Sequence, residues 1–538
     1  MPDQNDLYVT VAAVGIIALW ITLAELYGAR VRPTSDVLRA CRTMGPRLNA
    51  VVVSGEYLSA ASFLGVAGLV LKRGVDALWY PVGFTAGYLA MLLFVAAPLR
   101  RSGAYTLPDF AELRLGSVRL RRICSLFAII ISWLYLVPQL EGAGLTVHAV
   151  TEAPMWVGAA VLMVIVTFNI YTGWRSITIL QAFQYWIKLT ALAIPVFVLL
   201  IHSRGATLHL NPGSQVPVIS DAVADNNTWL RPLGYGKHPL LATYSLIVAL
   251  LLGAMGLPQV LGRHYTDPNG RSARRTTQLA LVLLGVFYLF PMAAGWLARL
   301  YVPRLLVAGN PGNLGNADAA LLLLPSAALG GWPAILLSGL IAAGAFAAFV
   351  SAANGLVVSV AGGLCTDVLP ARLRDFRVAT VVAWSVPLAF VLAVSSLDLA
   401  QGVGLAFAVA ASSFCPLLVL GIWWRGLTDI GARAGILAGG GVAVAAVLPA
   451  AAGVLPPGWQ EVAAQPAAFT VPLAFLTMIV VSRRTKDRVP TEVSRILLRL
   501  HAPDRLGLAE DRERGQRGTR VGMSTDALSR IYGGRHRR

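Results

Sequence analysis

The feature that most constrains this chain is the repetition of apolar runs long enough to cross a lipid bilayer. The hydrocarbon core of a bilayer is about 30 Å thick, and roughly 20 apolar residues in a helix span it. Such runs recur from Val9 to Val481 with only short segments between them. No large extramembrane domain fits within this stretch.

Composition excludes a soluble globular domain. The chain is 56% hydrophobic and 13% charged, whereas about 25% of residues are charged in an ordinary globular protein. The sequence therefore predicts an all-α polytopic membrane protein with about thirteen transmembrane helices. The predicted spans lie near residues 8–28, 48–70, 76–98, 122–148, 154–172, 176–201, 239–262, 277–302, 331–364, 378–397, 400–424, 432–454 and 467–482.

The net charge of +18 raises the possibility of a nucleic-acid partner. Its distribution argues against one, because the basic residues lie between apolar runs and not on one face of a soluble fold. Positive charge in short loops marks the cytoplasmic side of a membrane protein. This pattern predicts an inner-membrane protein with its N-terminus outside and its C-terminus in the cytoplasm. The basic loops are residues 30–47, 100–122, 263–275, 372–377 and 425–433.

Domain organisation follows from the same pattern. Residues 1–482 form one transmembrane domain with a core at about 48–424, and residues 483–538 form a basic tail that is expected to be partly disordered. An amphipathic piece of this tail, Val493–Leu500, could instead lie on the membrane surface. The first apolar run lacks the basic flank and small-residue cleavage site of a signal peptide, so it is expected to remain.

Several observations argue against an enzyme or a metalloprotein. The seven histidines are scattered, and none of the motifs H-E-x-x-H, G-x-S-x-G or the P-loop occurs. The four cysteines have no metal-ligand spacing and are expected to be free thiols. They are Cys41, Cys124, Cys365 and Cys415.

Two predicted spans are interrupted by glycine and proline. The second reads VVVSGEYLSAASFLGVAGLV and contains Gly55; the seventh reads LIVALLLGAMGLPQVLG and contains Gly253, Gly256 and Pro258. Five helices separate their starts, so they cross the bilayer in opposite directions. This arrangement is typical of a five-plus-five inverted repeat, here spans 2–6 and 7–11, with a binding site at the interruptions. Alternatively, these residues only let helices pack closely.

Two polar residues in membrane spans are candidates for a functional role. Insertion of a carboxylate into a membrane span costs at least about 2–3 kcal/mol, so Glu56 needs a polar pathway or a partner. It could carry a coupling proton or lie near a cation; alternatively, it is a structural group bonded to a neighbouring helix. Ser351 lies in a span rich in small residues. Its hydroxyl and nearby carbonyls suit a hard cation, although a serine often bonds only to its own helix.

Several segments resemble the sodium:solute symporter family, in particular its acetate permease branch. The resemblance covers about residues 50–425 and implies the leucine-transporter-type fold, with spans two, seven and nine as its first, sixth and eighth helices. The matching segments are GEYLSAASFLG (55–65), SGAYTLPDF (102–110), YLVPQLEGAG (135–144), YTGWRSIT (171–178), LGAMGLPQVLGRHYTD (252–267) and LCTDVL (364–369).

The resemblance implies a Na⁺ site made by the carbonyls of Gly55 and Leu58 and by Ala348 and Ser351. A further ligand of the family is often Ser or Thr, and this chain has Ala352 in its place. The sixth span also reads ILQAFQYW, where family members often carry an Asp. These two departures leave H⁺ open as the coupling ion in place of Na⁺, with Glu56 and Asn354 as coupling or gating residues; no other cofactor is expected.

The same resemblance implies cation-coupled uptake of a short-chain monocarboxylate such as acetate, propionate or pyruvate by alternating access. The implied substrate contacts are Ser59, Ser62, Gln139, Gly256 and Gln259. Alternatives are a symporter of the same fold for an amino acid, a sugar or another solute, and a transporter-like sensor. We expect a monomer or weak homo-oligomer in the lipid bilayer, with no nucleic-acid partner.

Overall fold

The computed structural model describes residues 44–172, 174–203, 230, 232–233, 238–301, 317–369, 375–393 and 398–506. All regular structure in this part of the chain is helical, which confirms the predicted all-α class. The first predicted span, Cys41 and the chain beyond residue 506 lie outside the described residues. Cys124, Cys365 and Cys415 are buried, free thiols.

Each remaining predicted span corresponds to a helix or a broken helix. Ten helices among the described residues are long and apolar enough to cross a membrane, and α9 is a shorter apolar helix. The first repeat comprises α3 (Pro46–Tyr57) with α4 (Val66–Arg73), α5 (Trp79–Phe94), α8 (Val118–Thr151), α9 (Met155–Thr172) and α10 (Trp174–His202). The second comprises α12 (Pro239–Gly253) with α13 (Pro258–His264), α14 (Gly270–Leu300), α17 (Trp332–Gly363), α18 (Phe376–Ala393) and α19 (Leu399–Trp423).

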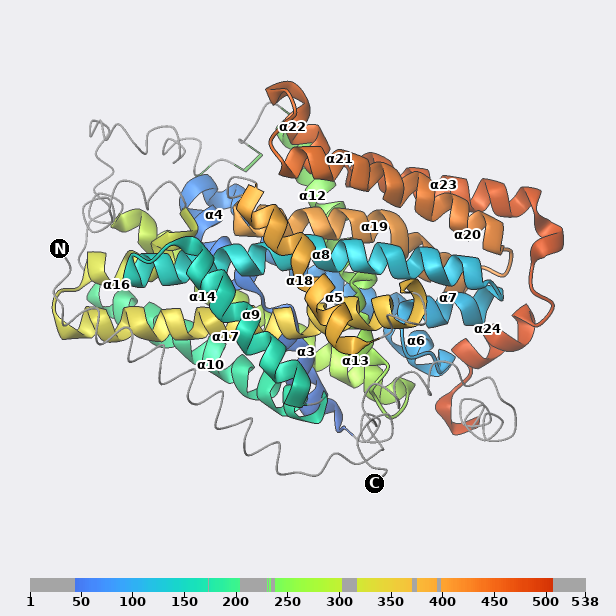
Figure 1. Cartoon of the computed structure of the whole chain (residues 1–538), viewed down its shortest axis with the longest axis horizontal. Coiled ribbons are helices and arrows are strands. Elements are labelled where there is room, and N and C mark those ends of the chain that lie inside the picture. Colours follow the sequence, from blue (N-terminus) through green and yellow to red (C-terminus); the bar gives the residue numbers. More distant parts are fainter. Residues whose placement is uncertain are drawn as a thin grey trace.

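The long helices run lengthwise through the molecule (Figure 1), where α8 lies against both α17 and α19. In the most apolar window of α19, 94% of the residues are buried, against 28% in α18, so α19 lies at the centre and α18 at the periphery. Additional helices flank this core along one side or cap its ends. They are α6 (Ala96–Ser102), α7 (Leu107–Leu115), α16 (Ala320–Ala328), α20 (Asp429–Ile436), α21 (Val442–Ala451), α22 (Pro457–Ala464), α23 (Ala467–Arg484) and α24 (Val493–His501).

Both predicted interruptions are breaks in helices. Helix α3 ends at Tyr57, and the chain is extended at Leu58 (φ −74°, ψ 98°) before the helix that leads into α4 begins. Helix α12 ends in a short 3₁₀ turn, and Leu257 is extended (φ −73°, ψ 118°) before α13 begins at Pro258. Proline suits this first helical position because its missing N–H would have no partner there.

The glycines beside the breaks show the repeat symmetry. A Cβ atom on Gly55 would lie 2.5 Å from the carbonyl oxygen of Gln181 in α10. A Cβ atom on Gly256 would lie 2.7 Å from the carbonyl oxygen of Ala410 in α19. Helix α10 is the fifth of the first repeat and α19 the fifth of the second. Each broken helix therefore uses glycine to approach the last helix of its own repeat, as an inverted repeat requires.

The amphipathic segment after α23 lies against the protein. Helix α24 packs on α6 at one end of the bundle (Figure 1), and Leu500 is buried there. Arg101 Nε donates to Asp504 Oδ1 at 2.9 Å, and Arg499 Nε donates to the carbonyl of Arg101 at 3.2 Å. The first part of the basic tail is thus attached to the start of the transmembrane core.

Candidate functional site

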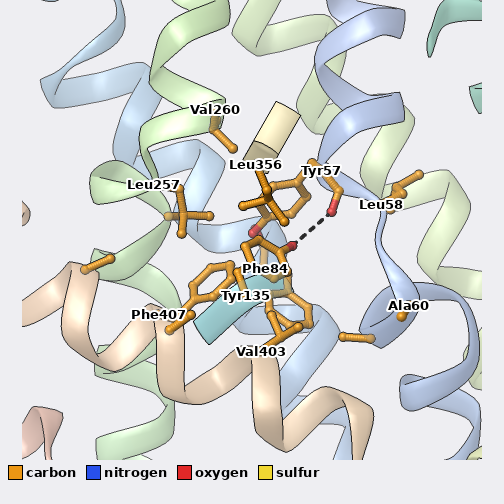
Figure 2. Close-up of a cluster of buried hydrophobic side chains, with 14 of the residues drawn as sticks. Tyr57, Leu58, Ala60, Phe84, Tyr135, Leu257, Val260, Leu356, Val403 and Phe407 are labelled. Carbon is orange, nitrogen blue, oxygen red and sulfur yellow. Dashed lines mark hydrogen bonds between the residues drawn. The ribbon is translucent and has the colours of Figure 1, made fainter. Parts of the chain in front are cut away.

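Aromatic side chains fill the space between the two breaks. Figure 2 shows Tyr57, Phe84, Tyr135 and Phe407 with Leu257 from the second break. The rings of Phe84 and Phe407 are 5.2 Å apart, and those of Tyr135 and Phe407 are 6.1 Å apart. Because these rings come from four helices, the centre of the molecule is tightly packed around both breaks.

Three predicted substrate residues lie at the first break. Ser59 and Ser62 on the broken helix bond to tyrosines, and Gln139 of α8 bonds to the backbone of that helix. Tyr135 Oη donates to Ser59 Oγ at 3.2 Å, and Ser62 Oγ lies 2.9 Å from Tyr288 Oη. Gln139 Oε1 accepts from the backbone N–H of Ala60 at 3.0 Å. The structure therefore brings Ser59, Ser62 and Gln139 to the first break, where hydroxyl and amide groups border the aromatic cluster.

The predicted substrate residues at the second break have different surroundings. Gly256 packs against Ala410 and Phe414 of α19, which leaves no room for a side chain. Gln259 is buried, and its Oε1 atom accepts no hydrogen bond from the described residues. Gly256 therefore sets helix packing, while Gln259 holds a buried acceptor near the break.

The four residues of the predicted cation site lie together. Ser351 Oγ donates to the carbonyl of Gly55 at 2.8 Å and is 3.1 Å from the carbonyl of Ala348. The carbonyl of Leu58 belongs to the same group, because one side-chain donor reaches it and Gly55. The first broken helix and α17 thus meet at a cluster of oxygen atoms.

That donor is Lys188 of α10. Its Nζ atom donates to the carbonyl of Leu58 at 2.9 Å and also to the carbonyl of Gly55 and to Ser351 Oγ. Lys188 is completely buried. The amino group of a lysine therefore lies among the oxygen atoms that were predicted to bind Na⁺.

Glu56 forms a buried ion pair beside this cluster. Its Oε2 atom is 2.5 Å from Arg263 Nε of α13, and both side chains are 2% exposed. Arg263 also donates to Thr178 Oγ1 at 3.1 Å and to Gln181 Oε1. A Cβ atom on Gly355 would overlap the Glu56 carboxylate, so this glycine makes room for the pair.

Gln181 connects the ion pair to the predicted cation site. Its Nε2 atom donates to the carbonyl of Ser351 at 3.1 Å while its Oε1 atom accepts from Arg263. Asn354, one turn after Ser351, is fully buried, and its side-chain amide makes no hydrogen bond to the described residues. The two broken helices, α10 and α17 therefore share one polar network.

Sequence reasoning missed Lys188 and misplaced Arg263. A lone lysine within a predicted span is a signal for a functional site. The polar residues Thr178, Gln181, Gln184 and Lys188 recur every three or four positions and are all fully buried, so they form a stripe on one face of α10. Arg263 was assigned to a cytoplasmic loop because it follows an apolar run, but α13 continues through it.

Ion pairs also join elements at the two ends of the bundle. Near the end of α4, Lys72 Nζ is 3.2 Å from Asp398 Oδ1. At the opposite end, Arg121 of α8 pairs with Asp109 and Glu112 of α7 and with Asp367 after α17, at 2.6 to 2.8 Å. These ion pairs link neighbouring elements at each end of the central region.

Asp318 is a buried acid next to the Lys72–Asp398 ion pair. Its Oδ2 atom accepts from the backbone N–H of Leu399 at 2.7 Å. Burial, together with the nearby Asp398 carboxylate, raises the pKa of Asp318 to about 7, although the Leu399 N–H and Lys72 oppose the rise. The folded protein therefore binds a proton here at a pH where the unfolded chain does not.

We expect Asp318→Asn to remove part of the pH dependence of thermal stability. Between the ordinary aspartate pKa of about 3.9 and the raised value, the folded protein holds up to one proton more than the unfolded chain. The free energy of unfolding therefore falls by up to about 1.4 kcal/mol per pH unit as the pH rises. Melting curves of purified wild type and variant from pH 5 to 8 test this. The melting temperature of the wild type minus that of the variant should fall up to about pH 7 and then level off. A difference that stays constant over this range contradicts the assignment.

These features define the class of the protein. Two oppositely directed broken helices that meet at a buried polar centre are the architecture of a secondary transporter with an inverted repeat. The chain belongs to the sodium:solute symporter family, whose sequence profile matches residues 38–439. It is therefore a transporter and not an enzyme, and membership of this family implies Na⁺ as the coupling ion.

Individual relatives support this placement. Over 437 residues the chain is 31% identical to YwcA, an uncharacterized symporter of Bacillus subtilis, covering 79% of this chain and 82% of the relative. It is 30% identical over 447 residues to a monocarboxylic acid transporter of Corynebacterium glutamicum, covering 79% and 80%. Among solved structures, a Na⁺-coupled sialic acid symporter in a substrate-bound outward-open state has a TM-score of 0.65 at 16% identity, covering 88% of this chain and 97% of that one.

Proposed function

We propose that this transporter takes up a short-chain monocarboxylate, such as acetate, propionate or pyruvate, together with a cation. The observation that carries the proposal is the charge of the buried centre. Glu56 and Arg263 balance each other, so Lys188, when protonated, supplies one positive charge in excess. A monocarboxylate bound near the break would neutralise this charge, whereas a neutral or zwitterionic solute would not.

The residues around the first break suit a small anion. Ser59, Ser62 and Gln139 supply hydroxyl and amide groups beside the aromatic cluster, and the dense packing of the rings favours a small solute. Lys188 lies at hydrogen-bond distance from the carbonyl of Leu58, the residue before Ser59. The Corynebacterium glutamicum relative is a monocarboxylic acid transporter, which is the same chemical class.

Alternating access would require the ion pairs at the two ends of the bundle to separate in turn. The Lys72–Asp398 pair lies at the end of the bundle near α4, and the Arg121 cluster lies at the end with α6, α7 and α24 (Figure 1). We assign the second end to the cytoplasm, because the basic segments at residues 100–122 and 271–275 meet there. The N-terminus would then be outside and the C-terminus inside the cell membrane.

Counterflow of labelled solute tests the substrate class without assuming a coupling ion. Proteoliposomes with the full-length protein are loaded with unlabelled pyruvate and diluted into labelled pyruvate, without an ion gradient. We expect rapid exchange, competition by acetate and propionate, and no competition by a neutral amino acid or a sugar. Exchange of only an amino acid or a sugar would overturn the monocarboxylate assignment, and absence of exchange for every solute would favour a sensor.

A further inference from the structure

We propose that a proton carried by Lys188 replaces Na⁺ as the coupling ion of this transporter. This inference rests on the proposed symport function and identifies its driving ion. It follows from the position of one side chain, because Lys188 Nζ bonds to three of the oxygen atoms that were predicted to bind Na⁺.

The hydrogen bonds around Lys188 match an ammonium group. A protonated lysine has three N–H donors and no acceptor, and the carbonyls of Gly55 and Leu58 and the hydroxyl of Ser351 accept one bond each. Ser351 Oγ can accept from Lys188 because its own proton points to the carbonyl of Gly55 or Ala348. A neutral amine has two N–H donors and one lone pair, so it would keep only two of these three donated bonds, and the contact with Ser351 would reverse, with Oγ–H donating to the lone pair.

The ammonium also excludes a metal ion from the same place. Two like charges repel more strongly where little water screens them, and here the ammonium and a metal ion would also compete for the same oxygens. Ala352 further weakens the site for Na⁺, because it lacks the hydroxyl expected from the family resemblance. Both features favour a bound proton over a bound metal ion.

The coupling step is a simple proton transfer. In the outward-facing state the neutral amine of Lys188 accepts H⁺ from the external solution, and its lone pair becomes the third N–H bond. The ammonium then ties the first broken helix to α17 through Gly55, Leu58 and Ser351 and attracts the carboxylate at the break. In the inward-facing state the solute leaves, the N–H bond breaks, and H⁺ passes to the cytoplasm.

The surrounding charges assign this role to Lys188 and not to Glu56. Among the described residues of the elements packed against α10, Glu56 on α3 is the charged group that acts on Lys188. Glu56 is held by Arg263 of α13 at 2.5 Å, while α17 faces the lysine with Ser351. Because Glu56 already has a cationic partner, we assign the transferred proton to Lys188, whose bonded partners are all uncharged oxygens.

Net uptake by the wild-type protein gives the first test. Labelled pyruvate is used because little of it is protonated at neutral pH and so little crosses lipid unaided; protein-free liposomes correct for the remainder. We expect an inward H⁺ gradient to drive accumulation and replacement of Na⁺ by choline to leave it unchanged. If only a Na⁺ gradient drives accumulation, the Lys188 inference is wrong while counterflow still supports the proposed function.

Removal of the titratable group gives the second test. Lys188→Met keeps the aliphatic length without the charge, and Lys486→Ala serves as the lysine control because Lys486 is exposed and remote from the breaks. We expect Lys188→Met to lose at least tenfold of H⁺-driven uptake and the residual uptake to lose its dependence on pH, while the control behaves as wild type. Residual uptake that keeps the wild-type pH profile would overturn the inference.

The third test needs no substrate. Without the ammonium, the oxygens of Gly55, Leu58, Ala348 and Ser351 are free to bind Na⁺, and Ala352→Ser adds the missing hydroxyl. We expect Na⁺, but not choline, to raise the melting temperature of Lys188→Ala/Ala352→Ser and to leave that of the wild type unchanged. A shift in the wild type as large as in the double variant would show that Na⁺ binds beside Lys188 and would refute the proposal.

Discussion

Replacing Arg263 with glutamine is expected to destabilise the protein by about 3–5 kcal/mol, because it leaves the Glu56 carboxylate buried without its cation. The two side chains are 2.5 Å apart and 2% exposed, so water cannot replace the lost partner. Arg263 also bonds to Thr178 and Gln181, which ties α13 to α10. We expect a large fall in the melting temperature and in the yield of folded protein, both measured in detergent.

A double-mutant cycle separates this ion pair from a proton site. Glu56→Gln should also be strongly destabilising, since it leaves the arginine uncompensated, and Glu56→Gln combined with Arg263→Gln should recover much of the loss. If Glu56→Gln instead leaves the melting temperature unchanged but abolishes H⁺-driven uptake, Glu56 carries the proton. The structure favours the first result because the carboxylate is already paired.

Those features of the fold that depend on local sequence could be predicted. Gly55 in the second span and Gly253, Gly256 and Pro258 in the seventh mark the two breaks, because glycine and proline act on the backbone wherever the helix packs. The apolar runs likewise located the helices from residue 48 onward. Each of these signals can be recognised within one short stretch of sequence, without knowledge of which helices pack together.

The contacts at the centre could not be predicted in the same way. Lys188 is 133 residues from Gly55 and 163 from Ser351, so only the packing of α10 against both helices shows that it reaches their oxygens. Arg263 was placed wrongly for the same reason. An arginine after an apolar run resembles a residue of a cytoplasmic loop, and only the folded structure shows that it is buried against Glu56. Partners of buried charges are set by tertiary packing, not by sequence spacing.

The docking of α24 is a third case of this kind. The alternation of apolar and basic residues in Val493–Leu500 predicts an amphipathic surface but not what covers it. In the structure its apolar face packs on α6, and the charged residues Arg101 and Asp504 fix its position. The amphipathic pattern is equally compatible with a lipid surface and with a protein surface.

Substitution of Gly55 with alanine is expected to abolish most uptake. The new methyl group would lie 2.5 Å from the backbone oxygen of Gln181, and a backbone oxygen cannot move aside without moving α10. Overpacking of this kind costs about 1–3 kcal/mol. The displacement would also separate the carbonyl of Gly55 from Lys188, which sits on the same helix as Gln181, so we expect net uptake to fall more than tenfold even where the protein still folds.

Gly285→Ala in α14 is the matched control. A Cβ atom at this position meets nothing within 4 Å, and alanine favours a helix by about 0.5–1 kcal/mol relative to glycine. This variant should therefore match or slightly exceed the wild type in melting temperature and match it in pyruvate counterflow. Equal activity of the Gly55 and Gly285 variants would contradict the close approach of α3 to α10. Loss of uptake in Gly55→Ala alone would show that this approach positions the oxygens around Lys188, because the two variants add the same methyl group to a helix and differ in what that group meets.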